Sequence, residues 1–303
     1  MRRIRLILML LFWIRIAFAQ QTPMYTQYNF NMQTINPAYA GTWESMGYLV
    51  LGRYQWLGME GAPTTYTFSV QSPVKNQNIA WGVDVVADKI GKEKSITLSG
   101  DYSYRLRVSW DSYLRMGLKL GISSYSNPLT RYKQYTGDDI YQEDVEVKLI
   151  PNFGVGLMLY AKDYYIGLSV PKIIQTDLYV TVDNVNYTSC SEMRHFYFSA
   201  GYVFKLSDFL KFKPTGLVKA VIGSPVQFDI TANFLLKDKI WFGAMYRWGD
   251  SYGFIGQFLI NRRMRFGYAF DFTISKLRTH GSHELMFSYE LGYKRKWSTP
   301  RMF

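Results

Sequence analysis

The side chains best suited to catalysis or metal binding are three histidines and one cysteine, and their spacing supports neither activity. His280 and His283 are three residues apart, which on a strand puts them on opposite faces, and His195 is far from both in sequence. No Gly-x-Ser-x-Gly or His-Glu-x-x-His motif occurs, and Cys190 has no second cysteine to pair with. The sequence therefore predicts no catalytic residues, no metal site and no cofactor.

Charged side chains offer a second kind of chemistry, because many of them alternate with apolar residues along the chain. Two interpretations stay open: a charged lumen that selects solutes or binds a charged segment, or a set of charges that neutralise one another and fill the lumen. Acids in 138–146 lack the glycine and final glutamate of an EF-hand loop, so strong calcium binding is not expected there. The alternating charged residues are Asp84, Asp101, Arg105, Arg107, Arg115, Lys119, Lys211, Lys213, Lys219, Asp229, Arg247, Arg265, Asp271, Glu284 and Glu290.

The elements that carry these charges read as long strands with one apolar face and one polar face. In 264–274 the apolar face holds Met264, Phe266, Tyr268, Phe270, Phe272 and Ile274. Soluble sandwiches alternate too, but their strands average about five or six residues, whereas a tilted membrane strand needs about nine to eleven. The sequence therefore predicts an all-β protein, a transmembrane antiparallel β-barrel of about 14 strands.

The fourteen expected strands and their links also predict an orientation. Links after even-numbered strands are short, and the two longest, 125–148 and 172–193, follow odd-numbered ones. Outer-membrane barrels have short periplasmic turns and longer outer loops, so the chain enters from the periplasm. Short links after the ninth and eleventh strands predict one low part of the outer rim. The strands are 46–55, 64–72, 78–88, 94–108, 111–124, 149–160, 163–171, 194–206, 209–222, 225–237, 239–248, 251–261, 263–275 and 281–293.

Composition agrees with this class. Hydrophobic residues make up 48%, aromatic residues 17% and charged residues only 19% of the 303 residues. The mean hydropathy of −0.13 is too low for a bundle of membrane helices. No long Lys/Arg run accompanies the net charge of +12, so we expect no nucleic-acid partner. Aromatic residues near strand ends predict interfacial girdles, namely Tyr54, Trp56, Trp81, Trp110, Trp241, Trp248, Tyr252 and Tyr293.

The sequence predicts four regions along the chain. Residues 1–19 predict a signal peptide, with early arginines, an apolar core and an Ala17-Phe18-Ala19 cleavage site, which leaves Gln20 first. Residues 20–45 are expected along the periplasmic mouth or as a lumen plug, and 46–293 form the outer-membrane barrel. Residues 294–303 form a basic periplasmic tail. Two alternatives to a non-enzymatic membrane barrel stay open, namely a secreted soluble sandwich and an outer-membrane enzyme.

Several blocks of the mature sequence resemble the PorP/SprF family. They are Gln27-Tyr28, Asn36-Pro37-Ala38-Tyr39-Ala40-Gly41, Arg53-Tyr54-Gln55-Trp56, Gly61-Ala62-Pro63-Thr64-Thr65, Asp88-Lys89-Ile90-Gly91 and Pro300-Arg301-Met302-Phe303. Met302 departs from the aromatic residue that the family has there. The resemblance implies an outer-membrane protein of the type IX secretion system of Bacteroidota. Members serve the secretion apparatus or help export or retain a large cell-surface adhesin, as in gliding motility, and no catalytic residues carry over.

The candidate sites are therefore partner-binding ones, in three groups. Residues of the first block, Asn36, Pro37, Tyr39 and Gly41, predict a defined plug or lip, or else a plain strand entry. The second group predicts a rigid first outer loop that could hold a partner, or else a turn with only a structural role. Its residues are Arg53, Gln55, Trp56, Gly58, Gly61 and Pro63. The third group is the basic tail, which predicts a binding site for an acidic periplasmic partner, or else a tail that stays in solution. Its residues are Lys294, Arg295, Lys296 and Arg301. The rival function is a porin-like or fatty-acid-transporter-like channel for small solutes.

Overall fold

The computed structural model describes residues 22–43, 45–74, 77–128, 130, 144–182, 185–261, 263–274 and 279–292. The expected signal peptide, the basic tail with Lys294, Arg295, Lys296 and Arg301, and Tyr293 lie outside these described residues. In the described part of the chain no helix is long and apolar enough to cross a membrane.

Strands dominate the fold, together with two short 3-10 helices, η1 (Met32–Thr34) and η2 (Pro37–Tyr39). The first seven strands are β1 (Gly47–Tyr54), β2 (Thr64–Pro73), β3 (Ile79–Ile90), β4 (Glu93–Arg107), β5 (Tyr113–Asn127), β6 (Val145–Tyr160) and β7 (Tyr164–Val170). The others are β8 (Thr176–Val182), β9 (Val185–Glu192), β10 (His195–Tyr202), β11 (Phe204–Lys205), β12 (Leu210–Val221), β13 (Gln227–Leu236), β14 (Ile240–Arg247), β15 (Ser251–Leu259), β16 (Met264–Thr273) and β17 (Ser282–Glu290).

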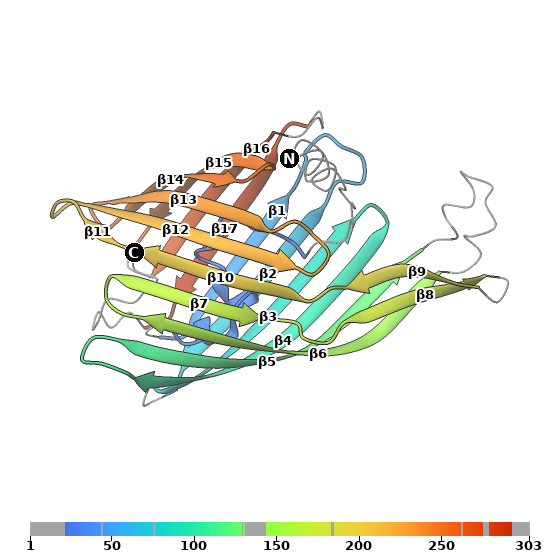
Figure 1. Ribbon diagram of the computed structural model, residues 1–303. Helices are drawn as coiled ribbons and strands as arrows, with labels where there is room; N and C mark the ends of the chain where they lie inside the picture. Colours follow the sequence, from blue (N-terminus) through green and yellow to red (C-terminus); the bar gives the residue numbers. More distant parts are fainter. Residues whose placement is uncertain are drawn as a thin grey trace, which may run out of the picture.

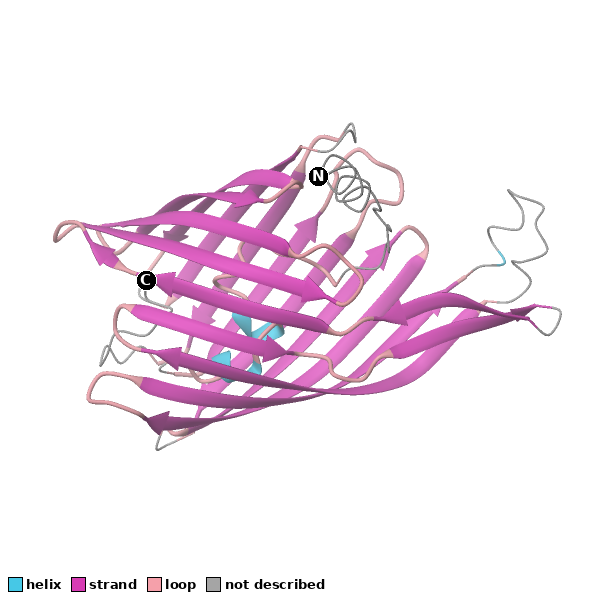
Figure 2. Ribbon diagram, in the orientation of Figure 1, coloured by secondary structure: helices cyan, strands magenta, loops and turns pink. Residues whose placement is uncertain are grey.

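The strands close into one antiparallel barrel (Figure 1). Barrel strands that follow one another along the chain pair with each other, β1 pairs with β17, and β10 pairs with both β7 and β12, because β8 and β9 form a separate pair. Because β10 and β11 are two pieces of one strand, the closed barrel has 14 strands, which confirms the predicted number and class. A soluble sandwich is excluded for this chain. The two 3-10 helices lie inside the ring of strands (Figure 2).

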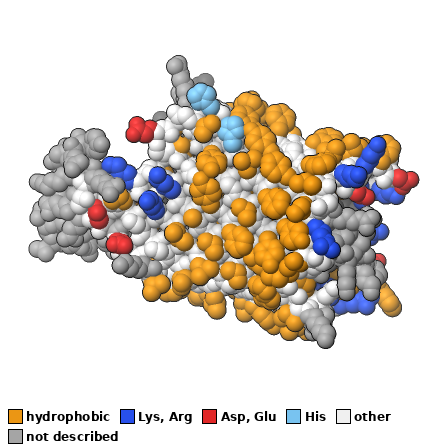
Figure 3. All heavy atoms as spheres, turned by 180° about the vertical axis from the view of Figure 1, so that it is seen from behind, with side chains coloured by type: hydrophobic (Ala, Val, Ile, Leu, Met, Phe, Trp, Pro, Cys, Tyr) orange, Lys and Arg blue, Asp and Glu red, His pale blue; other side chains and the backbone are white. Residues whose placement is uncertain are grey.

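Alternation along each strand sends apolar side chains outward and polar ones inward. On β13, Phe228 and Ile230 are 45% and 60% exposed, whereas Asp229 and Thr231, which alternate with them, are each 1% exposed. This is the reverse of a soluble protein and is what lipid outside a barrel requires. Hydrophobic side chains accordingly cover the middle of the outer surface, with charged side chains toward its two ends (Figure 3).

The two barrel ends differ as predicted, with one correction. Turns at one end, called the inner end below, are short, and the rim at the other, outer end is low where β12 meets β13 and β14 meets β15. However, the predicted loop 172–193 contains strands β8 and β9, which pair only with each other and project beyond the barrel (Figure 1). Strands β5 and β6 also extend further outward than predicted. Beyond the membrane no lipid constrains the strands, so the lipid-facing pattern did not predict their length.

An aromatic row marks the inner edge of the outer surface, and one predicted girdle residue is wrong. Near the inner end, the rings of Phe204, Phe212, Phe234 and Phe242 follow one another across neighbouring strands at 6.1, 4.9 and 5.3 Å. Trp241 does not belong to a girdle: it is 2% exposed, points inward and meets other lumen side chains. It occupies an inward position of β14, so the end of a strand was a poor guide to its direction.

Candidate functional site

Residues 22–43, called the N-terminal segment below, run through the barrel interior. The segment starts toward the outer end, where the Thr22 hydroxyl is 3.1 Å from the Tyr197 hydroxyl, and ends beside Gly47 at the inner end of β1. On the way the Tyr28 hydroxyl bonds to the Thr215 hydroxyl at 2.9 Å. Burial raises the pKa of Tyr28, so its hydroxyl stays neutral. The segment therefore contacts several sides of the lumen before the first strand begins.

The middle of the segment is shaped by local capping and by small residues in the barrel wall. The Asn36 side chain accepts a hydrogen bond from the Ala38 backbone N–H at 2.9 Å and donates one to the Leu157 carbonyl at 3.2 Å. Pro37 is the first residue of η2. A Cβ atom at Gly117 would overlap the backbone of Ala38, so the wall needs glycine there for the segment to fit.

An apolar core fills the lumen around the segment, a feature that the sequence analysis missed. Phe30 packs edge-on against Trp241, with ring centroids 5.7 Å apart. Apolar residues share the inward face with the polar ones; the buried cluster includes Tyr25, Tyr28, Phe30, Met32, Tyr39, Trp43, Leu49, Leu51, Met158, Tyr165, Leu217, Leu235, Trp241 and Met286. The signal was present in the sequence, because Leu49, Leu51 and Trp241 break the polar face of their strands.

A buried ion cluster holds the start of the segment. Arg53 on β1 lies 2.9 Å from the Asp271 carboxylate and 2.5 Å from that of Glu284, and all three side chains are at most 3% exposed. Glu284 also accepts hydrogen bonds from the backbone N–H groups of Thr26 and Gln27, at 2.6 and 3.0 Å. One guanidinium and two carboxylates thus join three barrel strands to the segment.

Two further networks neutralise charge in the lumen. Lys119 contacts Asp84 at 2.6 Å and Asp101 at 3.0 Å. Arg247 makes a two-pronged contact with Asp229, with nitrogen–oxygen distances of 2.9 to 3.0 Å. These pairs favour the interpretation of mutually neutralising charges.

Arg107 does not belong to this set, although the alternation placed it in the lumen. It is exposed and turns back to the carbonyl groups of Ser109 and Trp110 in the β4–β5 turn. At the end of the hairpin these two carbonyl groups hold the guanidinium outside the lumen network.

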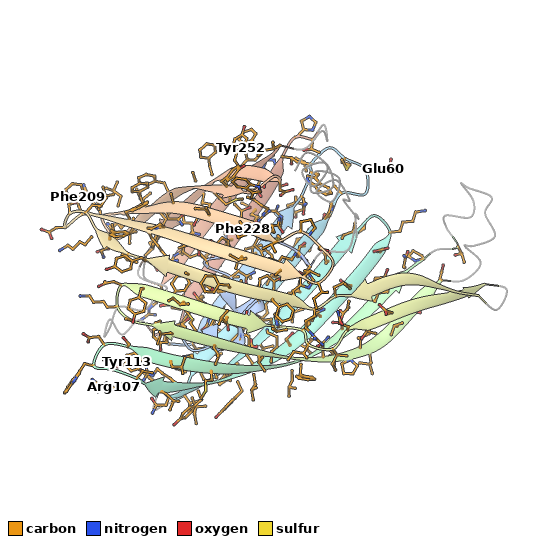
Figure 4. The ribbon with its side chains drawn as sticks, viewed as in Figure 1. Glu60, Arg107, Tyr113, Phe209, Phe228 and Tyr252 are labelled. Atoms are coloured by element: carbon orange, nitrogen blue, oxygen red, sulfur yellow. The ribbon has the colours of Figure 1, made fainter. Side chains whose placement is uncertain are left out.

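A cavity of about 610 Å³ lies on the outer side of the segment. Its lining includes Thr22, Pro23, Tyr25 and Ile35 from the segment and Glu60 and Gly91 from the outer loops. Glu60 lies at the outer end of the barrel (Figure 4). Ion pairs and hydroxyl groups line the sides, including Asp84, Lys119, Ser95, Thr97, Lys172 and Glu192. The cavity is large enough for a small ligand or one or two side chains of a partner protein.

The first outer loop, 55–63, forms a rigid outer lip at this mouth. The Leu57 N–H donates to the Gly281 carbonyl at 2.8 Å, and the Gly91 N–H donates to the Gly61 carbonyl at 2.8 Å. Gly58 and Gly61 have φ angles of +89° and +74°, which favour glycine, and a Cβ at Gly58 would overlap the His280 ring. Hydrogen bonds to the loops on both sides therefore fix the shape of the lip.

The predicted site residues thus fall in separate places. Asn36, Pro37, Tyr39 and Gly41 are buried in the N-terminal segment, and Arg53 belongs to the buried ion cluster. The other five described residues lie in the outer lip, where Gly58 and Gly61 are exposed; they are Gln55, Trp56, Gly58, Gly61 and Pro63. A role in partner binding stays a prediction for all of them.

The three histidines have different surroundings. His195 is buried at the outer end of β10, His280 contacts the outer lip, and His283 faces outward beside the Tyr268 hydroxyl. Among the residues whose placement is described, no group of three or more His, Cys, Asp or Glu side chains could hold a metal ion.

A closed antiparallel barrel with an apolar exterior, short turns at one end and long loops at the other is an outer-membrane β-barrel. Within that class, the family model for the type IX secretion system membrane protein PorP/SprF matches residues 17–289. The chain belongs to the PorP/SprF family and is an outer-membrane protein. The resemblance of its N-terminal blocks is therefore confirmed at the level of the family.

Comparison with known proteins adds the fold alone. No curated protein matches the sequence. Omp33 of Acinetobacter baumannii has a TM-score of 0.50 at 10% identity, over 80% of this chain and 97% of that chain. The toluene transporter TodX of P. putida has a TM-score of 0.50 at 9% identity, over 87% of this chain and 95% of that chain. Identities this low support a shared barrel architecture and say nothing about a substrate of this chain.

Proposed function

We propose that this protein is a non-enzymatic outer-membrane component of the type IX secretion system that holds a large secreted surface protein, of the adhesin type, through protein contacts. The carrying observation is the course of the N-terminal segment, which fills the lumen between the inner end and the outer cavity. A barrel whose lumen is filled acts on partners at its rims. The family membership supports the connection with secretion.

The outer lip is the proposed contact surface for the secreted partner. Long loops on a rigid barrel are the usual place for recognition, and this one is fixed from both sides. Leu57 is 47% exposed at its tip, so the lip offers an apolar contact beside the cavity mouth. The buried residues Asn36, Tyr39 and Gly41 would act on the partner only indirectly, by setting the position of the segment.

A channel for small solutes is the second candidate. One observation favours it, namely the cavity of about 610 Å³ with its mouth among the outer loops. A solute pathway would also require the N-terminal segment to leave the lumen, which costs the buried contacts described above. We therefore favour partner binding.

Substitution of Gly58 by valine tests the outer lip. Gly58→Val puts a branched side chain at a φ of +89° and against His280, so the lip must change shape. We expect about 30-fold less of the secreted partner to co-purify from detergent-solubilised membranes, the loss of a typical interface hot spot. The matched control is Gly223→Val on the low rim, where φ is +84° and nothing lies within 4 Å of the added Cβ.

Two results would contradict the proposal. One is recovery of the wild-type barrel alone under gentle conditions, without any surface protein or secretion component. The other is an equal loss of partner in the Gly58→Val and Gly223→Val proteins, because general damage to the barrel would then explain both.

A further inference from the structure

Exposed apolar side chains continue past the inner edge of the barrel. Along the outward face of β4 and the turn after it, Leu106, Val108 and Trp110 are 40%, 62% and 84% exposed. At the turn after β11, Leu206 and Phe209 are 56% and 57% exposed. Phe209 and Arg107 lie at the end of the barrel opposite Glu60 (Figure 4).

These residues extend the lipid-facing surface. The last backbone pair of the β4–β5 hairpin joins Arg107 to Tyr113, yet the same outward alternation continues to Trp110. The turn is ordered: Val108 donates to the Ser112 carbonyl at 3.0 Å, and the Arg107 guanidinium lies 5.3 Å from the centre of the Trp110 ring. The tryptophan is therefore held outward, next to a cation.

Basic residues are concentrated at the same end. In the short turns and the strand positions beside them, the described basic residues are Arg105, Arg107, Lys162, Lys205, Lys211, Lys237, Lys239 and Arg263, against the acidic Asp111, Asp163, Asp208 and Asp238. At the outer end, acidic residues are the more numerous among described side chains: Glu60, Asp88, Glu93, Asp144, Glu146, Asp177, Glu192 and Asp250, against Lys89, Lys92, Lys94, Lys172 and Arg194. The charge of the described chain is thus divided between its ends.

The β13–β14 turn gives independent support. Lys237 and Asp238 both have positive φ angles, 50° and 53°. They are the central residues of a β-turn in which the Lys239 N–H donates to the Leu236 carbonyl at 3.0 Å. Aspartate tolerates a positive φ, whereas lysine is strained there. The chain nevertheless places Lys237 and Lys239 on the two sides of this tip, both exposed. At Lys237 the chain thus keeps a basic side chain in spite of backbone strain, which is consistent with a use for it at the inner rim.

We propose that the inner rim is a binding surface for anionic phospholipid headgroups of the periplasmic leaflet. Aromatic rings at the level of the headgroups and cations that reach the phosphates are the two parts of such a surface. The direct continuity of Trp110 and Phe209 with the lipid-facing belt favours lipid over an acidic periplasmic protein. This inference does not depend on the proposed partner at the outer lip.

Quenching of Trp110 by brominated lipids tests the proposal. The full-length protein is reconstituted in phosphatidylcholine vesicles that contain a minority of either brominated phosphatidylglycerol or brominated phosphatidylcholine. The Trp110 signal is the difference between the wild-type and Trp110→Phe proteins. We expect phosphatidylglycerol to quench it about two- to fivefold more strongly, in line with the attraction of one or two basic residues to an anionic surface. The preference should vanish at about 1 M NaCl, where the Debye length is about 3 Å.

Charge variants identify the responsible end. The preference should fall to that of the neutral lipid in Arg105→Gln/Arg107→Gln/Lys162→Gln, which removes the basic residues of the inner end on β4 and in the nearby β6–β7 turn, and persist in the outer-end control Lys89→Gln/Lys92→Gln/Lys94→Gln. Equal quenching by the two lipids, or a preference that survives high salt, overturns the proposal. So does a Trp110 that neither lipid quenches, because the turn would then lie in water and suit a periplasmic protein.

Discussion

Replacement of Arg53 by methionine is expected to lower the free energy of unfolding by about 3–5 kcal/mol, because it removes one partner from a buried ion cluster. Asp271 and Glu284 would remain buried, at 1% exposure each, without the guanidinium that lies between them. The same change removes the cation that positions Glu284, and Glu284 accepts hydrogen bonds from the backbone N–H groups of Thr26 and Gln27. Urea unfolding in detergent micelles, followed by tryptophan fluorescence, measures the effect.

Two controls separate the ion cluster from general damage. The triple variant Arg53→Met/Asp271→Asn/Glu284→Gln removes all three charges, so it should recover most of the lost stability. Arg107→Met removes an exposed arginine and should change stability by no more than about 0.5 kcal/mol. An Arg53→Met protein as stable as the Arg107→Met protein would show that the cluster does not hold the segment.

Removal of residues 24–40 is expected to turn the barrel into an open pore. Barrels of about eight strands are filled by their own side chains, whereas those of 16–18 strands leave an aqueous channel. With 14 strands, this barrel needs the segment to complete its interior. In planar bilayers the deletion variant should carry a steady current, and the wild-type protein should carry none of that size.

A folded but non-conducting deletion variant would contradict this prediction. Folding is checked independently, by the β-sheet circular dichroism signal and by the retention of the barrel's compact form in detergent. A wild-type protein that conducts as steadily as the deletion variant would instead favour the solute channel over the proposed function.

The strand pattern was predictable because lipid constrains every second residue. In 264–274 the apolar face Phe266, Tyr268 and Phe272 is exposed in the structure, and Asp271 opposite is buried. The pattern predicted less about the structure in the parts of the chain that do not face lipid. β8 and β9 project beyond the barrel, where no lipid constrains the strands, and Arg107 at the inner edge turns back to the Ser109 carbonyl.

The candidate site was less predictable, because its contacts are long-range. Arg53 is 218 residues from Asp271 and 231 residues from Glu284. These three meet only because β1 closes the barrel against β17, with Arg53 opposite Glu284. The N-terminal segment has no strand or helix periodicity, because its partners come from all around the wall. Pro37 and Gly41 indicated a defined shape but not its location.

A disulfide between the N-terminal segment and the barrel wall tests the central claim, that residues 22–43 lie in the lumen, most directly. A Cβ atom at Gly82 would lie 3.3 Å from that of Ala40, close to the spacing of a disulfide, and 2.4 Å from the Gln33 side-chain nitrogen, so Gln33→Ala is included in every variant to make room. In a Cys190→Ser background, the pair Ala40→Cys/Gly82→Cys should yield a disulfide-linked peptide from intact cells. The control pair Ala40→Cys/Gly100→Cys should stay reduced, since Gly100 has nothing within 4 Å. If both pairs stay reduced and Cys substituted at position 40 reacts as fast as an exposed thiol, the segment lies outside the lumen and the account is wrong.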